Sequence, residues 1–203
     1  MSQSTRDRLL EAAKTVFAEH GFEGATVQMI ATAAGANIAA INYHYGSKAE
    51  LYAKYVVGHL EASMGRMPRL SDDPGDPEGQ LRRLVAWFFE RFRPDSPLRR
   101  LNQDMSAMKG DFAETILETV IKPEFENCSE FVRALLPAKA PEEKVRNWVK
   151  SIISLCTGPL HSAHLYPLLF PGAPFDASEV SRQAEHVAQA ILDGLAADAR
   201  RLG

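Results

Sequence analysis

The sequence predicts an all-α protein, and three observations lead to that fold class. Apolar residues recur at intervals of three and four nearly throughout the chain, which is the spacing of one face of an α-helix. No stretch alternates between apolar and polar residues as a half-buried strand does. With 45% hydrophobic and 24% charged residues among 203, the chain has enough apolar material for a folded core, which excludes a disordered or collagen-like chain.

The first two expected helices are short and have defined ends. Ser4 is placed to cap a helix that carries an apolar face past Phe17, and Gly21 then supplies a left-handed residue that ends it. Thr26 is placed to cap a second helix, which stops at Gly35. The two helices together occupy little more than the first thirty residues.

Two more helices are expected directly after this pair. Asn37 is a suitable cap for a third helix of about two turns, which Gly46 breaks. Ser47 and Glu50 have the spacing of a capping box, which opens a fourth helix that reaches about Met64.

A segment rich in Pro, Gly and Asp, residues 67–79, separates these helices from longer ones. Helical repeats follow at 81–92, at 112–132 with Pro123 disturbing the middle, at 145–156 and at 180–195, with a Pro-rich connection at 166–175. The sequence therefore predicts a larger helical bundle after the N-terminal helices.

The net charge and the lengths of the apolar stretches indicate which partners and which cellular location the chain can have. The net charge of −3 argues against coating nucleic acid through bulk charge, although it is compatible with a local DNA-binding face. Apolar runs such as 85–89 and 152–156 are far shorter than the roughly 20 residues of a membrane span, and the N-terminus lacks an apolar signal core. We therefore expect a cytoplasmic protein without a membrane partner, whose Cys128 and Cys156 are reduced and buried.

Residues 26–48 are the candidate functional site. Two short helices joined by a tight turn have helix-turn-helix geometry, in which the second helix enters the DNA major groove, although such pairs also occur in helical proteins that never meet DNA. Ile41 and Tyr45 are placed to face a core, which leaves an uncharged outer surface suited to base edges and neighbouring groups suited to phosphates. The expected DNA-binding residues are Thr26, Ile38, Ala39, Ala40, Asn42, Tyr43, His44, Ser47 and Lys48.

A longer pattern runs through this region and fixes more than a dozen positions. It reads Gly21-Phe22-x-x-x-Thr26-x-x-x-Ile30-Ala31-x-x-Ala34-Gly35-x-x-x-x-x-Ile41-x-Tyr43-His44-Tyr45-x-Ser47-Lys48-x-x-Leu51-Tyr52. This pattern closely resembles the N-terminal signature of the tetracycline-repressor (TetR) family of bacterial regulators, and the similarity covers roughly residues 5–55.

The resemblance implies a homodimeric all-α repressor with a helix-turn-helix DNA-binding domain at 1–50 and a helical ligand-binding and dimerisation domain at 51–203. Its implied partners are double-stranded operator DNA and a small organic effector, and it implies no cofactor. Two positions depart from the family pattern. Asn42 stands where an aromatic residue is frequent, which changes the group offered to a base, and Tyr45 stands where Phe is usual, which changes packing.

Aromatic and methionine residues of the C-terminal part are candidate ligand contacts, although most residues of these types fill a core. The i, i+3 histidines are candidate polar anchors, and no third metal ligand can be named from the spacing, so no metal site is expected. The expected ligand-binding residues are Phe88, Phe92, Met105, Met108, Phe112, Trp148, His161 and His164.

Two apolar stripes near the C-terminus are expected to pair around a two-fold axis as a four-helix bundle between two copies. The alternative is that both stripes serve only the core of one chain. The expected interface residues are Val149, Ile152, Ile153, Val187, Ala188, Ile191 and Leu195.

No nucleophile elbow, phosphate-binding glycine loop, HExxH or CxxC motif is found in the sequence, so we do not expect an enzyme. The expected function is a ligand-responsive DNA-binding repressor that a small organic effector releases from a near-palindromic operator. The alternative is an all-helical small-molecule carrier or a small helical enzyme, in which the helix-turn-helix-like segment is only packing.

Overall fold

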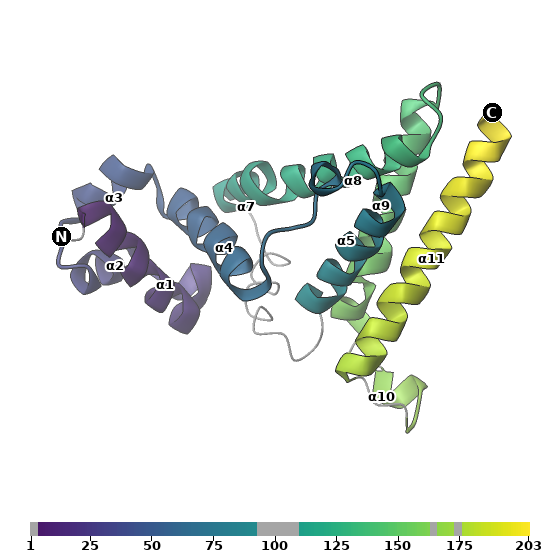
Figure 1. Ribbon diagram of the computed structural model, residues 1–203. Coiled ribbons are helices and arrows are strands. Elements are labelled where there is room, and N and C mark those ends of the chain that lie inside the picture. Colours follow the sequence, from purple (N-terminus) through teal and green to yellow (C-terminus); the bar gives the residue numbers. More distant parts are fainter. Residues whose placement is uncertain (1–3, 93–109, 163–165, 173–175) are drawn as a thin grey trace. The chain divides into compact units, whose positions relative to one another are not determined.

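A computed structural model describes residues 4–92, 110–162, 166–172 and 176–203, and every regular element in these ranges is a helix (Figure 1). The predicted all-α fold is therefore confirmed. The chain divides into two compact units: Met1–Ser63 with Arg100–Lys122 form the N-terminal unit, and Met64–Arg99 with Pro123–Gly203 form the C-terminal unit. A domain boundary at residue 50 stays a prediction.

The N-terminal unit begins with three helices that pack against one another: α1 (Thr5–Gly24), α2 (Val27–Ala33) and α3 (Ile38–Tyr45). Ser4 Oγ accepts the N–H of Asp7 at 3.2 Å, which is the predicted cap of α1. Inside α1, Gly21 has a φ of 67°, so the regular helix ends there and a short turn to Gly24 follows. α4 (Lys48–Met64) comes next and ends where the sequence predicted.

An aromatic cluster forms much of the core of the N-terminal unit. Phe17 of α1 and Tyr52 of α4 meet edge to face with ring centroids 4.8 Å apart. Phe112 of α7 (Gly110–Ile116) stacks on Phe22 with centroids 3.7 Å and planes 12° apart. Phe112 therefore belongs to this cluster, whereas the sequence analysis grouped it with the aromatic residues of the C-terminal part.

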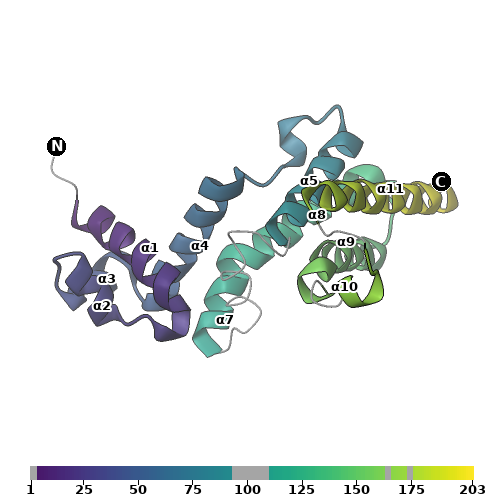
Figure 2. The ribbon, with the colours of Figure 1, turned by 90° about the horizontal axis from the view of Figure 1, so that it is seen from below.

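The helix predicted over 112–132 is observed as a continuous run from α7 through a five-residue π-helix, η2 (Leu117–Ile121), into α8 (Lys122–Leu135) (Figure 2). Pro123 lies directly after the π-helix. Its ring clashes with the carbonyl four residues earlier in a regular α-helix, and it has no N–H to donate. The local widening to a π-helix relieves this conflict, so the predicted disturbance at Pro123 is confirmed.

The C-terminal unit is built on packed helices. After the short turn η1 (Leu70–Asp72), α5 (Pro77–Phe92) packs against α9 (Glu142–Ser162) and α11 (Ala177–Leu202), and α9 also contacts α11. A short α10 (Tyr166–Leu169) lies in the connection between α9 and α11. None of the described helices combines the length and the apolar character that a membrane crossing requires.

Both cysteines lie in this core as free thiols, as predicted. Burial raises the pKa of the Cys156 thiol to about 12, and burial also raises the pKa of the Cys128 thiol, with Cys156 and Glu124 nearby adding to the effect. Both thiols are therefore protonated and unreactive at neutral pH.

The residues expected at the dimer interface lie mostly inside the single chain. Five of them are at most 4% exposed and form part of the core of the C-terminal unit: Val149, Ile152, Ala188, Ile191 and Leu195. Ile153 and Val187 are half-buried against the same core. The apolar stripes of α9 and α11 therefore serve the core of one chain, which corrects the predicted interface for the five buried residues.

A polar contact joins α9 to α11 beside this core. The indole N–H of Trp148 donates to Asp198 Oδ2 at 3.0 Å, and Lys144 Nζ lies 3.0 Å from the same oxygen. Gly194 leaves room for the indole, because a Cβ on this residue would lie 2.3 Å from the Trp148 ring.

Candidate nucleic-acid interface

The start of α3 is fixed by its turn and its cap. Gly35 adopts a φ of 59° in the turn after α2, a conformation that glycine enters without strain. Asn37 Oδ1 then accepts the N–H of Ala39 at 3.0 Å, which satisfies a backbone donor at the start of the helix. Caps of this kind are worth about 0.5–2 kcal/mol, so Asn37 contributes appreciably to the stability of this helix of eight residues.

One face of α3 is anchored in the N-terminal unit. Ile41 is fully buried and Tyr45 is 8% exposed, as predicted. The Tyr45 hydroxyl donates to the Arg6 carbonyl at 2.8 Å, which connects the end of α3 to the start of α1. Burial raises the pKa of Tyr45 and the nearby Arg6 guanidinium opposes this shift, so the phenol is neutral at neutral pH.

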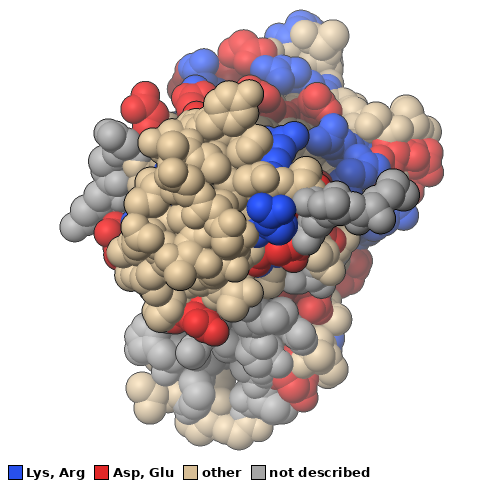
Figure 3. Space-filling model, turned by 90° about the vertical axis from the view of Figure 1, so that its left-hand side faces the viewer, with Lys and Arg blue, Asp and Glu red and all other residues tan. Residues whose placement is uncertain are grey.

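The opposite face of α3 is open to solvent. Tyr43 is 85% exposed and Ile38 is 37% exposed, and the side chains of Ala39 and Asn42 are also exposed. This side of the N-terminal unit presents a broad surface with few charged groups (Figure 3). A surface of methyl groups, an amide and a phenol matches the edges of bases in a major groove better than it matches the phosphate backbone.

The remaining predicted DNA-binding residues surround this surface. Thr26 Oγ1 caps α2 by accepting the N–H of Met29 at 3.1 Å, and Ser47 Oγ accepts the N–H of Glu50 at 3.1 Å at the start of α4. Ala40 and His44 are half-buried on α3. Thr26 and Ser47 therefore have a defined structural role as caps, and their contact with DNA stays a prediction.

Lys48 has a structural role that the sequence analysis missed. Its ammonium group donates to the carbonyls of Phe22 at 2.9 Å and Ala25 at 3.0 Å, and it lies 4.2 Å from the centre of the Phe22 ring. Two of its three N–H groups therefore stabilise the turn that follows α1, and contact of Lys48 with a phosphate stays a prediction. Only the tertiary structure shows these partners, because Lys48 is more than twenty residues from both.

Among the described residues of the N-terminal unit, three other cations are also held by partners. Arg8 Nε donates to the Ala34 carbonyl at 3.3 Å, Lys14 pairs with Glu11 at 2.7 Å, and Lys122 pairs with Glu118. Arg6 and Lys54 differ from these residues, because no ion pair is found for either within the described part of the chain.

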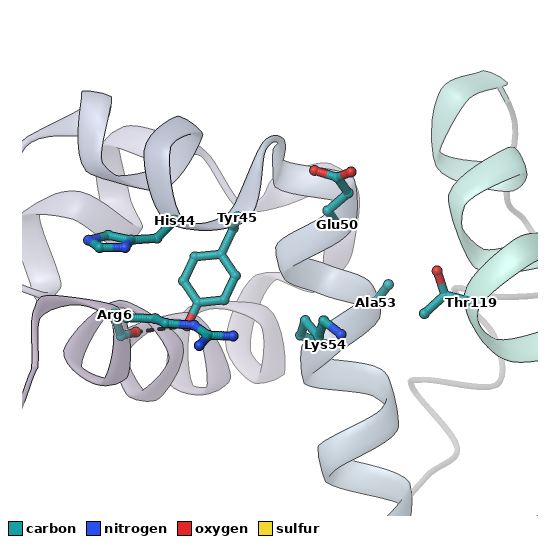
Figure 4. Close-up of a pocket in the computed structure, with 7 residues that line it drawn as sticks. All are labelled: Arg6, His44, Tyr45, Glu50, Ala53, Lys54 and Thr119. Atoms are coloured by element: carbon teal, nitrogen blue, oxygen red, sulfur yellow. Dashed lines mark hydrogen bonds between the residues drawn. The ribbon is translucent and has the colours of Figure 1, made fainter.

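Arg6 and Lys54 line a shared hollow of about 420 Å³ beside the end of α3 (Figure 4). Arg6 extends from α1 toward Lys54 on α4, and Thr119 of η2 lies on the facing element. The hollow is lined by Arg6, His44, Tyr45, Glu50, Ala53, Lys54 and Thr119. Nothing in the sequence distinguishes Arg6 or Lys54 from other cations, because isolated cations on an exposed face carry no motif.

Three of the expected ligand-binding residues have described side chains, and they are divided between the two units. Phe88 is 1% exposed in the core of the C-terminal unit, Phe112 is in the aromatic cluster of the N-terminal unit, and Trp148 is tied to Asp198. Met105, Met108 and His164 lie outside the described residues, as do the side chains of Phe92 and His161. Among the described residues, no three His, Cys, Asp or Glu side chains converge as a metal site would require.

The paired helices α2 and α3, with their capped starts and open outer face, define a helix-turn-helix protein. Residues 9–55 match the family described as bacterial regulatory proteins, tetR family, and residues 77–195 match the C-terminal domain of the HTH-type transcriptional dual regulator CecR. The second match alone spans more than half of the chain. The chain therefore belongs to the tetR family of bacterial regulators and has a C-terminal domain of the CecR type, which confirms the resemblance.

Individual relatives agree with this assignment. The HTH-type transcriptional repressor NicS of Pseudomonas putida is 39% identical over 89 residues, which are 43% of this chain and 42% of NicS. The chain thus spans less than half the length of the curated relatives that it matches. The fatty acid degradation regulator FadR of Bacillus halodurans shares the fold with a TM-score of 0.61 and 18% identity, over 93% of this chain and 98% of FadR. FadR of Bacillus subtilis in complex with stearoyl-CoA has a TM-score of 0.63 at 14% identity, over 92% and 97% of the two chains.

Proposed function

We propose that this chain is a ligand-responsive DNA-binding repressor, which binds a near-palindromic operator as a homodimer and leaves it when a small organic effector binds. It acts in the cytoplasm as a regulator rather than as an enzyme. Membership of the tetR family and the names of its relatives as transcriptional repressors support this proposal.

The observation that carries the proposal is the orientation of α3. Its buried residues Ile41 and Tyr45 hold the helix against the unit, and its exposed residues Ala39, Asn42 and Tyr43 form an uncharged outer face. Because one such helix reads only a few base pairs, two copies around a two-fold axis are needed to recognise two half-sites in successive major grooves.

The effector is proposed to be an organic molecule that is at least partly apolar, bound among the helices of the C-terminal unit. The FadR protein of Bacillus subtilis, which shares the fold, has been solved with stearoyl-CoA, so a helical domain of this kind is able to hold a ligand with a long apolar chain. Of the expected contacts, Phe88 and Trp148 lie in the described C-terminal core, where Trp148 is half-buried. DNA and effector must oppose each other reciprocally, because each favours a different conformation.

The dimer is proposed to use the outer faces of α9 and α11, because their inner faces are already buried in one chain. Leu155 of α9 is 46% exposed, and Leu168, Leu169 and Phe170 around α10 are between 53% and 74% exposed. Exposed large apolar side chains of this kind are typical of surfaces that another protein covers.

The proposal is tested by measuring binding of the purified chain to labelled duplexes from the DNA upstream of its own gene, with shuffled duplexes of equal composition as controls. We expect one fragment to bind far more tightly than its shuffled control, with an affinity that falls as salt rises. Equal binding to all fragments, or none, would contradict a repressor. Binding of organic ligands without any DNA binding would instead favour the carrier.

A further inference from the structure

The hollow beside the end of α3 carries two positive groups that no carboxylate of the described residues pairs with. Arg6 on α1 and Lys54 on α4 are both exposed and line this hollow. Figure 4 shows the Arg6 side chain extending toward Lys54. Two positive groups that line one hollow repel each other, and an anion bound between them offsets this repulsion.

Two carboxylates near these cations are directed elsewhere. Glu50 lines the hollow, but its carboxylate lies against Gly46, in the place that a Cβ on this glycine would occupy. In Figure 4 it points away from Arg6 and Lys54. The carboxylate of Asp7 accepts the Ser4 hydroxyl at 2.7 Å. The positive charge of the hollow is therefore available to an anion from outside the chain.

Tyr45 holds Arg6 at the edge of the hollow. Its hydroxyl donates to the Arg6 carbonyl at 2.8 Å, and the Arg6 guanidinium lies 5.9 Å from the centre of the Tyr45 ring. The hydrogen bond fixes the backbone from which the side chain extends, and the ring attracts the cation. Because Tyr45 is a buried residue of α3, the position of Arg6 is tied to this helix. Phenylalanine, which is usual at this position in the family pattern, has no hydroxyl for the first contact.

The hollow lies where a phosphate strand of bound DNA is expected. A recognition helix places its N-terminal residues on base edges, so its C-terminal end leads out of the groove toward the backbone. In α3, the exposed Ala39 and Asn42 precede His44 and Tyr45, which line the hollow at the end of the helix. A major groove is about 12 Å wide, which is the diameter of a helix with its side chains, so groups beside the helix meet the phosphates.

We infer that Arg6 and Lys54 bind one backbone phosphate of the operator in this hollow, with Tyr45 as the positioning residue that holds Arg6 in place. This inference rests on the proposed DNA-binding function. The guanidinium offers parallel N–H donors to phosphate oxygens, and the ammonium adds a point charge. Such a contact fixes how α3 lies in the groove without reading a base.

The first test replaces each cation by glutamine and measures binding to the operator duplex identified above, and to its single-base variants, over a range of salt concentrations. Arg6→Gln and Lys54→Gln should each weaken binding to every duplex by about tenfold per half-site. Each should also lower the slope of log affinity against log salt concentration by about 1 per half-site. The order of preference among the duplexes should stay as in the wild type. The double variant should lose less than the sum of the two losses, because both cations act on one phosphate.

Lys14→Gln is the matched control, because it removes the same charge from another exposed position of α1. Lys14 lies about 12 Å further along the helix than Arg6 and pairs with Glu11 at 2.7 Å. This variant should keep the wild-type affinity and salt slope. All three cations are exposed, so none of the substitutions should alter the fold, which circular dichroism verifies.

The second test removes a charge from the DNA instead. Methylphosphonate linkages are neutral, and they are placed one at a time along the backbone of each half-site. One position should weaken wild-type binding by about tenfold and leave binding of Arg6→Gln/Lys54→Gln unchanged, because this double variant no longer contacts that phosphate.

Tyr45→Phe tests the positioning role. It should weaken operator binding by at least about twofold in the wild type and cause no further loss in an Arg6→Gln background, because Tyr45 acts through Arg6. A merely structural role of the hydroxyl would weaken binding equally in both backgrounds, and this result would overturn the role of Tyr45.

The remaining outcomes separate this inference from the proposed function. Unchanged salt slopes in Arg6→Gln and Lys54→Gln, or an equal loss in Lys14→Gln, would overturn the phosphate contact and leave the DNA-binding function intact. A free phosphorylated molecule carries the same chemical group, so calorimetry with inorganic phosphate is run on the chain without DNA. Saturable phosphate binding that requires Arg6, with no sensitive methylphosphonate position, would assign the hollow to such a molecule and overturn the contact with DNA. A wild-type chain that binds no operator fragment would overturn the proposed function, and this inference with it.

Discussion

Asn42 is the exposed amide side chain of α3, and it offers both a hydrogen-bond donor and an acceptor to a base. An amide of this kind pairs with adenine in two places, so Asn42→Ala should cost about 1–3 kcal/mol per half-site at an adenine and relax the preference at that position alone. Affinities for a set of operator duplexes, each with one base pair changed, measure this effect. If the variant ranks the duplexes as the wild type does, Asn42 does not read a base.

Lys48 should matter more for folding than for charge. Lys48→Met removes two hydrogen bonds from an ammonium group to backbone carbonyls, so we expect the N-terminal unit to lose about 1–3 kcal/mol of stability. The salt dependence of operator binding should stay as in the wild type, because this ammonium is engaged inside the protein. If the slope of log affinity against log salt concentration fell by about 1 in this variant, Lys48 would instead be a phosphate ligand. Thermal unfolding and a salt titration give the two readouts.

For individual side chains, the sequence predicts contacts with nearby residues well and contacts with residues far away in the chain poorly. The caps at Ser4, Thr26 and Asn37 were predictable because each acts on a backbone N–H only two or three residues away. The partners of Lys48 and the stack of Phe112 on Phe22 depend on chain segments that meet only after folding.

Among the helices, the close approach of α9 and α11 depends on Gly194. Replacing a helical glycine by alanine normally stabilises a helix by about 1 kcal/mol, and Gly58→Ala on α4 should do so, because its new methyl group would meet nothing within 4 Å beyond the adjoining residues and backbone of its own helix. Gly194→Ala should instead lower stability, because the methyl group would lie 2.3 Å from the Trp148 ring. Denaturant unfolding of the two variants compares them directly. A stabilised Gly194→Ala protein would show that Trp148 moves aside freely.

The polar contact beside Gly194 should be sensitive to acid. The Lys144 ammonium and then the Trp148 N–H, which both bond Asp198, hold the pKa of this carboxyl below its usual range. A group with a lowered pKa stabilises the fold fully above its unfolded pKa of about 3.9, and this stabilisation is lost as pH falls through the lower folded value. Asp198→Asn should therefore melt below the wild type at pH 7, and the difference should shrink below about pH 4. A difference that is independent of pH would mean that the carboxylate charge is not the cause.

The helices also show where periodicity stops being informative. The apolar periodicity of residues 112–132 predicted one helix with a disturbance at Pro123. The run of α7, η2 and α8 confirms the helix, and the π-helix η2 confirms the disturbance. The same periodicity on α9 and α11 correctly predicted buried stripes but not what covers them, because a stripe has the same spacing whether it faces its own core or a second copy.

For the whole molecule, the assembly state should depend on exposed rather than buried apolar residues. Leu155→Glu places a charge on the outer face of α9, so the chain should fold normally and sediment as a monomer. Ile191→Glu places the same charge in the core of one chain, where Ile191 is 1% exposed, and should cost more than about 4 kcal/mol of stability. Sedimentation with circular dichroism distinguishes the two effects. A folded Ile191→Glu monomer would restore the interface predicted from the sequence.

The all-α fold and the helix-turn-helix were accessible from the sequence, because periodicity, caps and the signature at 21–52 are local patterns. The assignment of 110–122 to the N-terminal unit was not, since this segment follows the C-terminal α5 in the chain and meets α1 and α4 only through its tertiary contacts.

Few cations among the described residues of the N-terminal unit are unpaired, and this also bears on how the protein would search a chromosome. Sliding along unrelated DNA depends on sequence-independent attraction to phosphates. Here Arg8, Lys14, Lys48 and Lys122 are engaged by partners within the chain, and the outer face of α3 is uncharged. The protein is therefore expected to dwell briefly on non-cognate sequence and to reach its operator mainly by diffusion through solution. Few dimers would then be bound to other chromosomal sequences, so operator occupancy would directly follow changes in the number of free dimers.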